Sequence, residues 1–365
     1  MKRTPLGPSE GRPHRSPGPA RMADACSHGF ERGLMNPVLV LTRHDIATLM
    51  VPSDTLDAVA QGFAAVGAGR AQVPAPLHLA AAHGGFHAKA ASYRATRSWV
   101  ALKFNANLPG NPLRHGLPTI QGAILLFDGD DGRPLAVMDS IELTLRRTAA
   151  ATALAARYLA RRNSEVLAVC GCGAQALPQI EALLDVLPLR RVLLWDIDSK
   201  ATQRLRERLV GRIGLVEVQA FDRLEQATRA ADVIVTCTPS RQAFLGPDSV
   251  RPGCLIAAVG ADSPDKSEIA PGLMAVSMVV VDSRSQCAEM GDLHHAIAAG
   301  AMKAEDVHAD LSELVLGTKA GRRRDDEICL FDSTGVAIQD VATAASVFER
   351  AVQLGIGTSV DLSVE

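Results

Sequence analysis

A glycine-rich turn carries the clearest chemistry in the sequence. Residues 165–176 read EVLAVCGCGAQA, so the apolar run Val166–Cys170 leads into Gly171 and Gly173. In such a turn the first glycine permits a tight bend and the second lets backbone N–H groups approach a phosphate. The third small residue, here Ala176, lets the next helix pack closely. The positive end of that helix attracts the anion. The pattern predicts a site for the pyrophosphate of a dinucleotide.

An acidic residue follows at a suitable distance. Asp196 comes 25 residues after Gly171, at the end of a second apolar run, Arg191–Trp195. Its carboxylate can accept hydrogen bonds from a ribose 2′-hydroxyl and would repel a 2′-phosphate. Asp198 reinforces that repulsion. The sequence therefore favours NAD over NADP, and the alternative is a glycine-rich turn in an ordinary α/β domain.

Four other charged residues stand out. Asp262 follows an apolar run, where it could cap a turn or move protons to and from a substrate nitrogen. Lys103 lies inside the apolar stretch 99–104 and is either functional or a surface lysine on an edge strand, because burial of a lone charge is costly. Arg146 and Arg147 are adjacent on a predicted helix, so at most one can face an interdomain cleft.

The remaining pattern indicates the elements that position these residues. Before residue 140 we expect a helix over 53–67 and strands over 38–41, 99–104, 123–128 and 135–138, with strands also in the alternating stretch 73–90. A long alanine-rich helix over 140–161 follows. Beyond it, helices alternate with strands over 166–170, 192–195, 233–235, 255–259, 279–282 and 328–331, and a weak strand near Val216.

This alternation predicts an α/β fold with a Rossmann-type doubly wound parallel sheet. A mixed α/β domain precedes the Rossmann domain, and we expect a final helix over 337–354 to pack back on this mixed domain. We therefore expect a substrate domain over 35–150 with 336–358, and an NAD-binding domain over 151–335.

Composition narrows the function. The 365 residues carry a net charge of −2 and only 4% aromatic side chains, which argues against nucleic-acid and membrane partners. No apolar run is long enough to cross a bilayer. The seven cysteines are not spaced as a zinc site, so we expect no metal and reduced thiols in a cytoplasmic enzyme. Residues 1–34, rich in Pro, Gly, Arg and Ser, are a disordered tail or an over-extended start, and we favour Met35 as the first residue.

The chain resembles the ornithine cyclodeaminase/mu-crystallin family from Met35 to about Gly357. The resemblance rests on several motifs in order: Leu102-Lys103, Gly116-Leu117-Pro118-Thr119 with Gln121-Gly122, Thr144-x-x-Arg147-Thr148-Ala149-Ala150, Gly171-x-Gly173-Ala174-Gln175, Gly260-Ala261-Asp262-x-Pro264-x-Lys266-x-Glu268, and Asp332-Ser333-Thr334-Gly335 with Gln339-Asp340.

The resemblance implies a homodimer that binds NAD and a small amino-acid or imine substrate. It implies that Asp262 is the general acid/base, that Lys103 contacts the substrate and takes part in catalysis, and that Arg147 clamps a carboxylate beside the cofactor. Thr334 is a further substrate contact. The implied cofactor contacts are Thr119, Arg147, Gly171, Gly173, Ala174, Gln175, Asp196, Thr238, Val259, Gly260, Lys266 and Ser333. Thr236 could take the place of Thr238.

One departure concerns the substrate carboxylate. The family usually has an arginine after a Val-Pro stretch, and Pro76 stands at that place here. Lys89 either supplies the missing cation from a neighbouring strand or is merely solvated, and His78 and His87 are weaker candidates. A lysine would bind a carboxylate without the bidentate geometry of a guanidinium.

Three functions remain open. The first is an NAD(H)-dependent oxidoreductase acting on the C–N bond of a small amino acid or a cyclic imine. The second is an ornithine cyclodeaminase, a lyase that yields proline and ammonia with catalytic NAD. The third is a non-catalytic binding protein of the crystallin kind. Retention of Lys103, Arg147 and Asp262 argues against the third, and the missing arginine favours the first.

Overall fold

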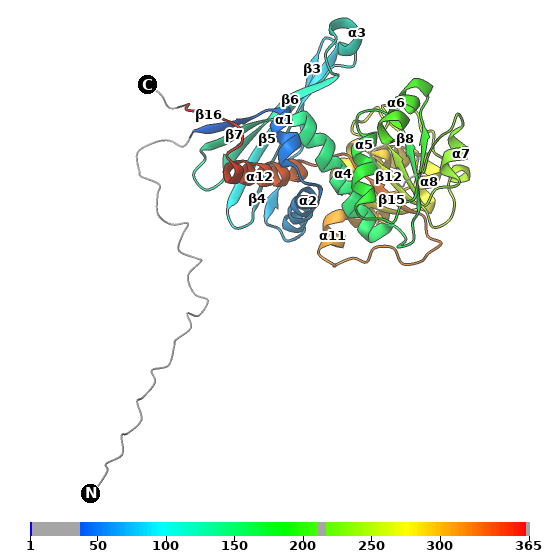
Figure 1. Cartoon of the computed structure of the whole chain (residues 1–365). Coiled ribbons are helices and arrows are strands. Elements are labelled where there is room, and N and C mark those ends of the chain that lie inside the picture. The colour runs from blue at the N-terminus through cyan, green and yellow to red at the C-terminus, as the bar shows by residue number, and fades with distance from the viewer. Residues whose placement is uncertain (2–36, 211–216, 363–365) are drawn as a thin grey trace. The chain divides into compact units, whose positions relative to one another are not determined.

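The computed structural model describes Met1 and residues 37–210 and 217–362 (Figure 1). The expectations for residues 1–34, for the start at Met35 and for Val216 itself lie outside this range. Residues 37–365 form one compact unit, built on two eight-stranded sheets.

The first sheet is mixed and has the order β16-β1-β7-β6-β5-β4-β2, with β3 paired to β4. Strands β1 and β7 run parallel and the other pairs are antiparallel. Its strands are β1 (Val38–Leu41), β2 (Ala71–Gln72), β3 (Leu77–Ala81), β4 (Gly84–Arg94), β5 (Ser98–Asn107), β6 (Ile120–Asp128), β7 (Pro134–Asp139) and β16 (Thr358–Val360).

Helices cover one face of this sheet. The final helix, α12, packs on α2, α4, β4 and β5, so the chain returns to the first sheet after it leaves the second. Its inner face is rich in alanine and valine, which allows this close packing. The helices are α1 (Arg43–Leu49), α2 (Pro52–Gly67), α3 (Asn111–His115), α4 (Ser140–Leu159) and α12 (Ala337–Leu354).

The second sheet is entirely parallel, with the order β10-β9-β8-β11-β12-β15-β13-β14. Its central strands are apolar and buried on both faces, as a parallel sheet covered by helices requires. The strands are β8 (Val166–Cys170), β9 (Arg191–Trp195), β10 (Glu217–Ala220), β11 (Val233–Thr236), β12 (Leu255–Ala258), β13 (Met278–Val281), β14 (Ala309–Asp310) and β15 (Cys329–Asp332).

Helical connections link these strands. They are α5 (Ala176–Leu184), α6 (Ser199–Leu209), α7 (Leu224–Thr228), α8 (Pro271–Val276), α9 (Arg284–Met290), α10 (Asp292–Ala298) and α11 (Leu311–Val315), with 3₁₀ turns over 247–249 and 304–306. The strand order reverses on either side of β8, between β9 and β11. Open α/β sheets bind ligands at such a reversal, outside the carboxyl ends of the strands.

The predicted fold class is confirmed, and the local differences have simple reasons. Strand β5 continues to Asn107, beyond the expected residue 104, because every residue of β4 from Gly85 to Arg94 pairs with it. Strand β5 therefore lies between β4 and β6, so Lys103 is not a surface lysine on an edge strand. The short helix α3 was not expected, since its sequence, NPLRH, has no apolar periodicity.

Across the described ranges, no helix is long and apolar enough to span a membrane. The same residues contain no cluster of three or more His, Cys, Asp or Glu side chains that could hold a metal ion.

Candidate active site at the carboxyl ends of the parallel strands

The glycine turn after β8 has two different glycines. Gly171 has a φ of +100°, and a Cβ placed there would lie 2.9 Å from the Cys237 carbonyl oxygen. Its glycine is therefore required by the fold itself. Gly173 does not have a positive φ, and a Cβ placed there would meet no atom within 4 Å. The protein leaves open space above Gly173, where backbone N–H groups can meet a phosphate.

Asp196 lies directly beside this turn, after β9. Its Oδ2 accepts a hydrogen bond of 2.6 Å from the Cys172 N–H, and its Oδ1 accepts one of 2.8 Å from the Asp198 N–H. Helix α5 begins just beyond the turn, and its N-cap residue Gln175 makes no capping hydrogen bond with its side chain. The N-terminal N–H groups of α5 thus remain available for an anion. These features fit a dinucleotide.

The next two strands of the sheet, β11 and β12, lead into three more of the predicted cofactor residues. Thr238 follows β11, and Val259 and Gly260 follow β12. Thr236 and Thr238 both donate their hydroxyl hydrogens to the buried carboxyl of Glu268, at 2.6 Å and 2.7 Å. The hydroxyls of both candidate threonines are therefore already used within the protein.

Asp262 stands two residues beyond Gly260, with a half-exposed side chain. Its Oδ1 lies 2.6 Å from the Lys266 ammonium. Desolvation opposes ionisation of Asp262, but the charge and hydrogen bond of Lys266 outweigh it and lower the pKa of Asp262. Asp262 is therefore ionised at neutral pH and suited to accept a proton.

Three charged side chains meet beneath the mixed sheet. The Lys103 ammonium lies 2.7 Å from Asp340 Oδ2, and Arg147 Nε lies 2.9 Å from Asp340 Oδ1. Arg147 also donates to the Gln339 side-chain oxygen. Burial lowers the pKa of Lys103 to about 7 although Asp340 favours its charged form. Burial opposes ionisation of Asp340, but the charges of Arg147 and Lys103 lower its pKa overall.

Lys89 lies opposite Lys103 on the neighbouring strand β4, so both side chains leave the same face of the sheet. The Lys89 ammonium donates to the carbonyl oxygens of Gly335 and Thr334, at 2.7 Å and 3.3 Å. It is therefore not simply solvated. Burial, together with the charge of Arg147, lowers the pKa of Lys89.

The loop after β15 is fixed by Asp282. Asp282 accepts hydrogen bonds from the Gly335 N–H at 2.7 Å, the Thr334 hydroxyl at 3.0 Å and the Ser333 hydroxyl at 3.2 Å. Gln286 Nε2 donates to the Thr334 hydroxyl oxygen at 2.8 Å. Thr334 thus presents its carbonyl, rather than its hydroxyl, to Lys89.

The structure also shows where Pro76 lies, at the place of the family's usual arginine, and where the two histidine candidates lie. Pro76 lines a cavity of about 150 Å³, and Asp282 and Gln286 line it as well. Pro76 therefore shares a cavity with the two side chains that fix the loop contacted by Lys89. His78 and His87 pair across β3 and β4, with ring centroids 4.6 Å apart.

The two adjacent arginines on α4 point to different places. Arg147 is buried against Asp340. Arg146 pairs with Glu142 at 2.6 Å and lines a groove of about 650 Å³ between α2, α4 and α5, which Ala174 also lines. Thr119 lies in the mixed-sheet half, just before β6, where its carbonyl accepts a hydrogen bond from Leu108.

Sequence reasoning did not assign roles to Asp340, Asp282 or Glu268. Each is a buried carboxylate, and most of its partners come from distant parts of the sequence. Asp340 and Glu268 did stand in the motifs quoted above, but nothing in the residue pattern indicated what they bind.

Known proteins are similar to this chain over most of its length. An alanine dehydrogenase from Archaeoglobus fulgidus is 38% identical over 322 residues, covering 88% of this chain and 98% of that protein. An iminosuccinate reductase from Paracoccus denitrificans is 34% identical over 334 residues, covering 89% and 100%.

Solved structures are similar over the same range. An archaeal alanine dehydrogenase dimer with bound NAD has a TM-score of 0.85 and 37% identity, and covers 89% of this chain and 99% of its own. A Thermococcus litoralis Δ1-pyrroline-2-carboxylate reductase in complex with NADH and L-proline has a TM-score of 0.84 and 30% identity, and covers 88% and 100%.

A model of one protein family matches residues 37–355, which include both sheets except for β16 at the C-terminal end. This match spans every motif on which the resemblance rested. The chain therefore belongs to the ornithine cyclodeaminase/mu-crystallin family.

Proposed function

We propose that the protein is an NAD-dependent oxidoreductase that interconverts a small α-amino acid and the corresponding imine. The observation that supports this proposal most strongly is that the protein has both a dinucleotide turn and a cluster of cations. The turn is at Gly171–Gly173, with its acidic partner Asp196. The cluster is that of Lys89, Lys103 and Arg147, which faces the loop after β15.

The cation cluster suits a carboxylate substrate. Lys103 and Arg147 share one carboxylate, Asp340, so the trio keeps one positive charge. Lys89 adds a second and has backbone carbonyls as its partners. A substrate carboxylate would neutralise part of this excess and restore the charged form of Lys103, whose pKa is about 7 in the free protein.

We assign to Asp262 the movement of a proton at the substrate nitrogen. Its carboxylate is ionised at neutral pH and can therefore accept a proton from the amino group in the oxidative direction. In the reductive direction it would return a proton to that nitrogen. Bound NAD supplies the hydride acceptor, and NADH the donor. Lys103 and Arg147 would hold the carboxylate so that the α-carbon faces the cofactor.

The relatives support this reading. The matched proteins include an alanine dehydrogenase, an iminosuccinate reductase and pyrroline-2-carboxylate reductases, all of which act on a carbon bonded to nitrogen. Their structures contain NAD, NADH or NAD⁺. We assign the cofactor to residues 151–335 and the substrate to residues 35–150 with 336–358.

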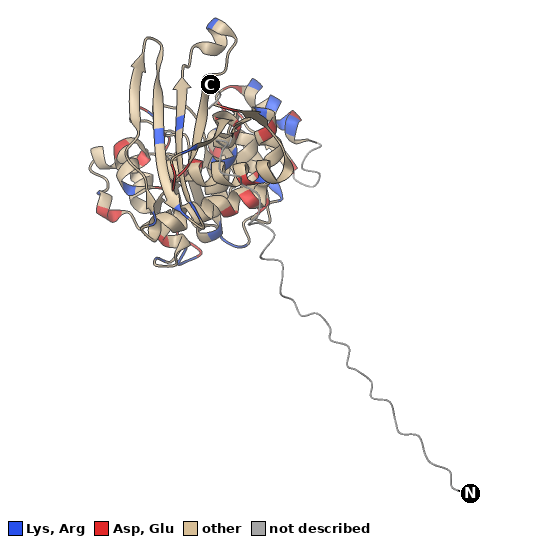
Figure 2. Cartoon of the chain, turned by 90° about the vertical axis from the view of Figure 1, so that its left-hand side faces the viewer, with Lys and Arg blue, Asp and Glu red and all other residues tan. Residues whose placement is uncertain are grey.

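We also propose a homodimer formed through the outer face of the mixed sheet. On the face opposite α12, Leu77 and Leu79 of β3, Phe104 of β5 and Leu125 of β6 are 57%, 47%, 41% and 37% exposed. Few charged residues lie along these long strands (Figure 2). A second copy would cover this apolar surface, as a monomer rarely leaves one exposed. Phe104→Asp should convert the dimer to a monomer in sedimentation.

The test of the activity uses the full chain and NADH absorbance. We would supply pyruvate with ammonia, pyruvate with methylamine, and pyrroline-2-carboxylate in turn. NADH oxidation with at least one of them is expected. A protein that binds NADH but oxidises it with none of these would contradict the proposal.

The cyclodeaminase alternative has its own signature. L-ornithine and a catalytic amount of NAD would give proline and ammonia without accumulation of NADH. That result would reassign the protein to the lyases, with the same site residues.

A further inference from the structure

The carboxylate of Glu268 lies in the parallel-sheet half and bonds only to neutral donors. It is fully buried and accepts four hydrogen bonds. Its Oε1 accepts from the Thr238 N–H at 2.6 Å and the Thr238 hydroxyl at 2.7 Å. Its Oε2 accepts from the Gly260 N–H at 2.8 Å and the Thr236 hydroxyl at 2.6 Å.

The arrangement is the same at the two oxygens. Each accepts one backbone N–H, which can only donate, and one hydroxyl, which could reverse its role. A hydrogen on either oxygen can therefore be donated only to the hydroxyl beside it, whose own hydrogen then loses this acceptor. The backbone N–H on the same oxygen then keeps only a neutral acceptor, so the ionised carboxylate binds all four donors best.

These bonds join the parts of the site that face the cofactor. Thr236 ends β11, Gly260 follows β12, and Asp262 comes two residues later. The approach is close, since a Cβ on Gly260 would lie 2.6 Å from Glu268 Oε1. The carboxylate of Glu268 thus sets the spacing between the turns that hold Thr238 and Asp262.

We infer that ionised Glu268 is a positioning residue that holds the turns at Thr238 and Gly260 in the conformation that binds NADH. The inference rests on the proposed function, because it assigns these turns to the cofactor. Protonation takes the acceptor from one threonine hydroxyl hydrogen and weakens the hydrogen bonds of the backbone N–H groups, so the turn at Thr238 or at Gly260 shifts and cofactor affinity falls. Glu268 does not touch the reacting atoms and acts through these two turns.

The surroundings of Glu268 bring the pKa of its carboxyl group into the physiological pH range. Burial and the neighbouring charge of Asp292 raise the pKa of Glu268 to about 7, although Thr236 and Thr238 favour its charged form. The other titratable groups close to it are the Cys170 and Cys237 thiols, and burial raises the pKa of both well above their usual value. The nearby cation, Lys266, is paired with Asp262.

Asp292 offers a matched variant. Its Oδ1 accepts from the N–H groups of Glu268 and Ile269 at 2.8 Å and 3.0 Å, and from the Ser267 hydroxyl at 3.3 Å. Its buried Oδ2 has no hydrogen-bond partner among the described residues. Asp292→Asn can therefore keep all three bonds on Oδ1 while it removes the charge that raises the pKa of Glu268.

The experiment measures the dissociation constant of NADH from its fluorescence between pH 5.5 and 8.5, with no substrate present. For the unmodified chain we expect constant affinity above pH 7.5 and a decrease below 7. With a pKa of about 7, the competent fraction at pH 6 is about one tenth, so the apparent constant rises about tenfold. In Asp292→Asn the midpoint moves to lower pH.

A second variant removes the carboxylate. Glu268→Gln carries an amide NH₂ in place of one oxygen, so it should bind NADH weakly at every pH and lose the midpoint. Circular dichroism establishes that the variant is folded. If it does not fold, Asp292→Asn still decides.

The outcomes separate the two claims. Equal NADH affinity at pH 6 and pH 8, or a midpoint that Asp292→Asn does not move, would overturn the role of Glu268 and leave the proposed function intact. Absence of NADH binding at every pH would overturn the proposed function itself, and the inference with it.

Discussion

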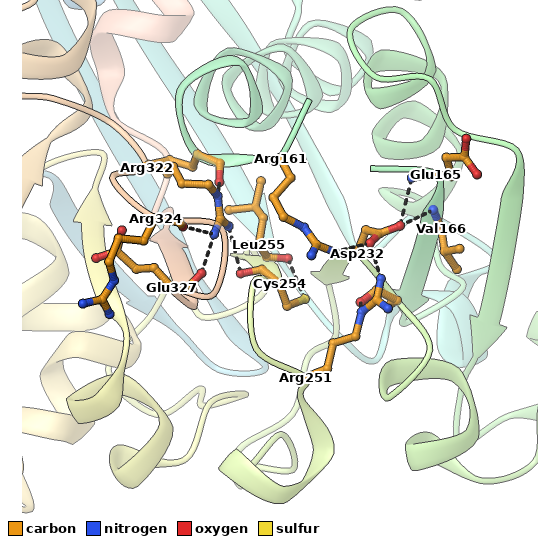
Figure 3. A network of polar contacts seen from close by, with 12 residues as sticks. Arg161, Glu165, Val166, Asp232, Arg251, Cys254, Leu255, Arg322, Arg324 and Glu327 are labelled. Carbon is orange, nitrogen blue, oxygen red and sulfur yellow. Dashed lines mark hydrogen bonds and ion pairs between the residues drawn. The ribbon is translucent and has the colours of Figure 1, made fainter. Parts of the chain in front are cut away.

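At the amino end of the parallel sheet, each carboxylate oxygen of the buried Asp232 accepts two hydrogen bonds (Figure 3). Its Oδ2 accepts the N–H groups of Glu165 and Val166 at 2.9 Å and 3.0 Å. Its Oδ1 accepts Arg161 and Arg251. Nearby, Arg322 donates to the backbone carbonyls of Leu159, Cys254, Arg324 and Glu327.

Beyond the carboxyl ends of the same strands, the charges are less completely matched. Lys89 donates to carbonyl oxygens, and Lys103 shares its one carboxylate with Arg147. The pKa of Lys103 falls to about 7 and that of Glu268 rises to about 7. Asp262 is half-exposed, with Lys266 as its ion-pair partner.

The difference separates stability from chemistry. A carboxylate with two cations and two backbone N–H groups holds a strand end in place, and no ligand can compete for it. A cluster with excess charge and pKa values near neutrality has capacity left for a substrate and a proton. Substitutions at the two ends should therefore fail in different assays.

The largest effect is expected at Asp262. Asp262→Asn removes the group that moves the proton and should lower kcat by about 10²- to 10⁴-fold. Its half-exposed side chain contributes little to folding, so the free energy of unfolding should change by less than about 0.5 kcal/mol. Steady-state kinetics and denaturant unfolding on the same sample check both parts. A large loss of stability would contradict the claim that the carboxyl end of the sheet serves chemistry and the amino end serves stability.

At the amino end we expect the opposite. Asp232→Ala leaves two backbone N–H groups and two arginines without their acceptor. The free energy of unfolding should fall by about 3 kcal/mol, at the low end for a broken buried pair because Arg251 is partly exposed and can turn to water. At a temperature where the variant is folded, kcat/KM should be unchanged. A specific loss of kcat would show that this end also serves catalysis.

Lys89 gives the smallest of these effects. Lys89→Met replaces the ammonium by an apolar side chain of similar length. Loss of a charged hydrogen bond to the substrate corresponds to about 1.5–3 kcal/mol, so KM for the carboxylate substrate should rise about 10- to 100-fold. NADH affinity serves as the internal control and should not change. An unchanged KM would show that Lys89 serves only as a structural contact to the carbonyls of Thr334 and Gly335.

Much of this site could be predicted from local sequence. The turn at Gly171, the acid at Asp196 and the position of Asp262 follow from apolar runs and from the rule that parallel strands end at one edge. The family motifs added Lys103 and Arg147. Local sequence is enough for these predictions because each depends on a few neighbouring residues and on one general property of the sheet.

The partners of these residues could not be predicted in the same way. Asp340 lies on a helix nearly 240 residues after Lys103, and helical periodicity shows that it faces inward but not what it meets. Lys89 donates to backbone carbonyls, and every residue has one, so the residue types in the sequence do not identify these partners. The hydroxyl hydrogens of Thr236 and Thr238 are not available to a ligand, because both are donated to Glu268. Such pairings depend on tertiary packing.

The measurement that tests the central claim most directly is NADH affinity in two alanine variants of the same turn. Gly173→Ala places a Cβ in open space with no positive φ, so the protein should stay as stable as before. The added methyl group would occupy the space that the claim assigns to a phosphate.

Gly171→Ala is the control, because its φ of +100° and the close Cys237 carbonyl should lower stability as well. For Gly173→Ala we predict an unchanged unfolding midpoint and NADH binding at least about tenfold weaker, equivalent to about 1.4 kcal/mol. NADH affinity equal to that of the unmodified chain would contradict a cofactor site at the carboxyl end of β8.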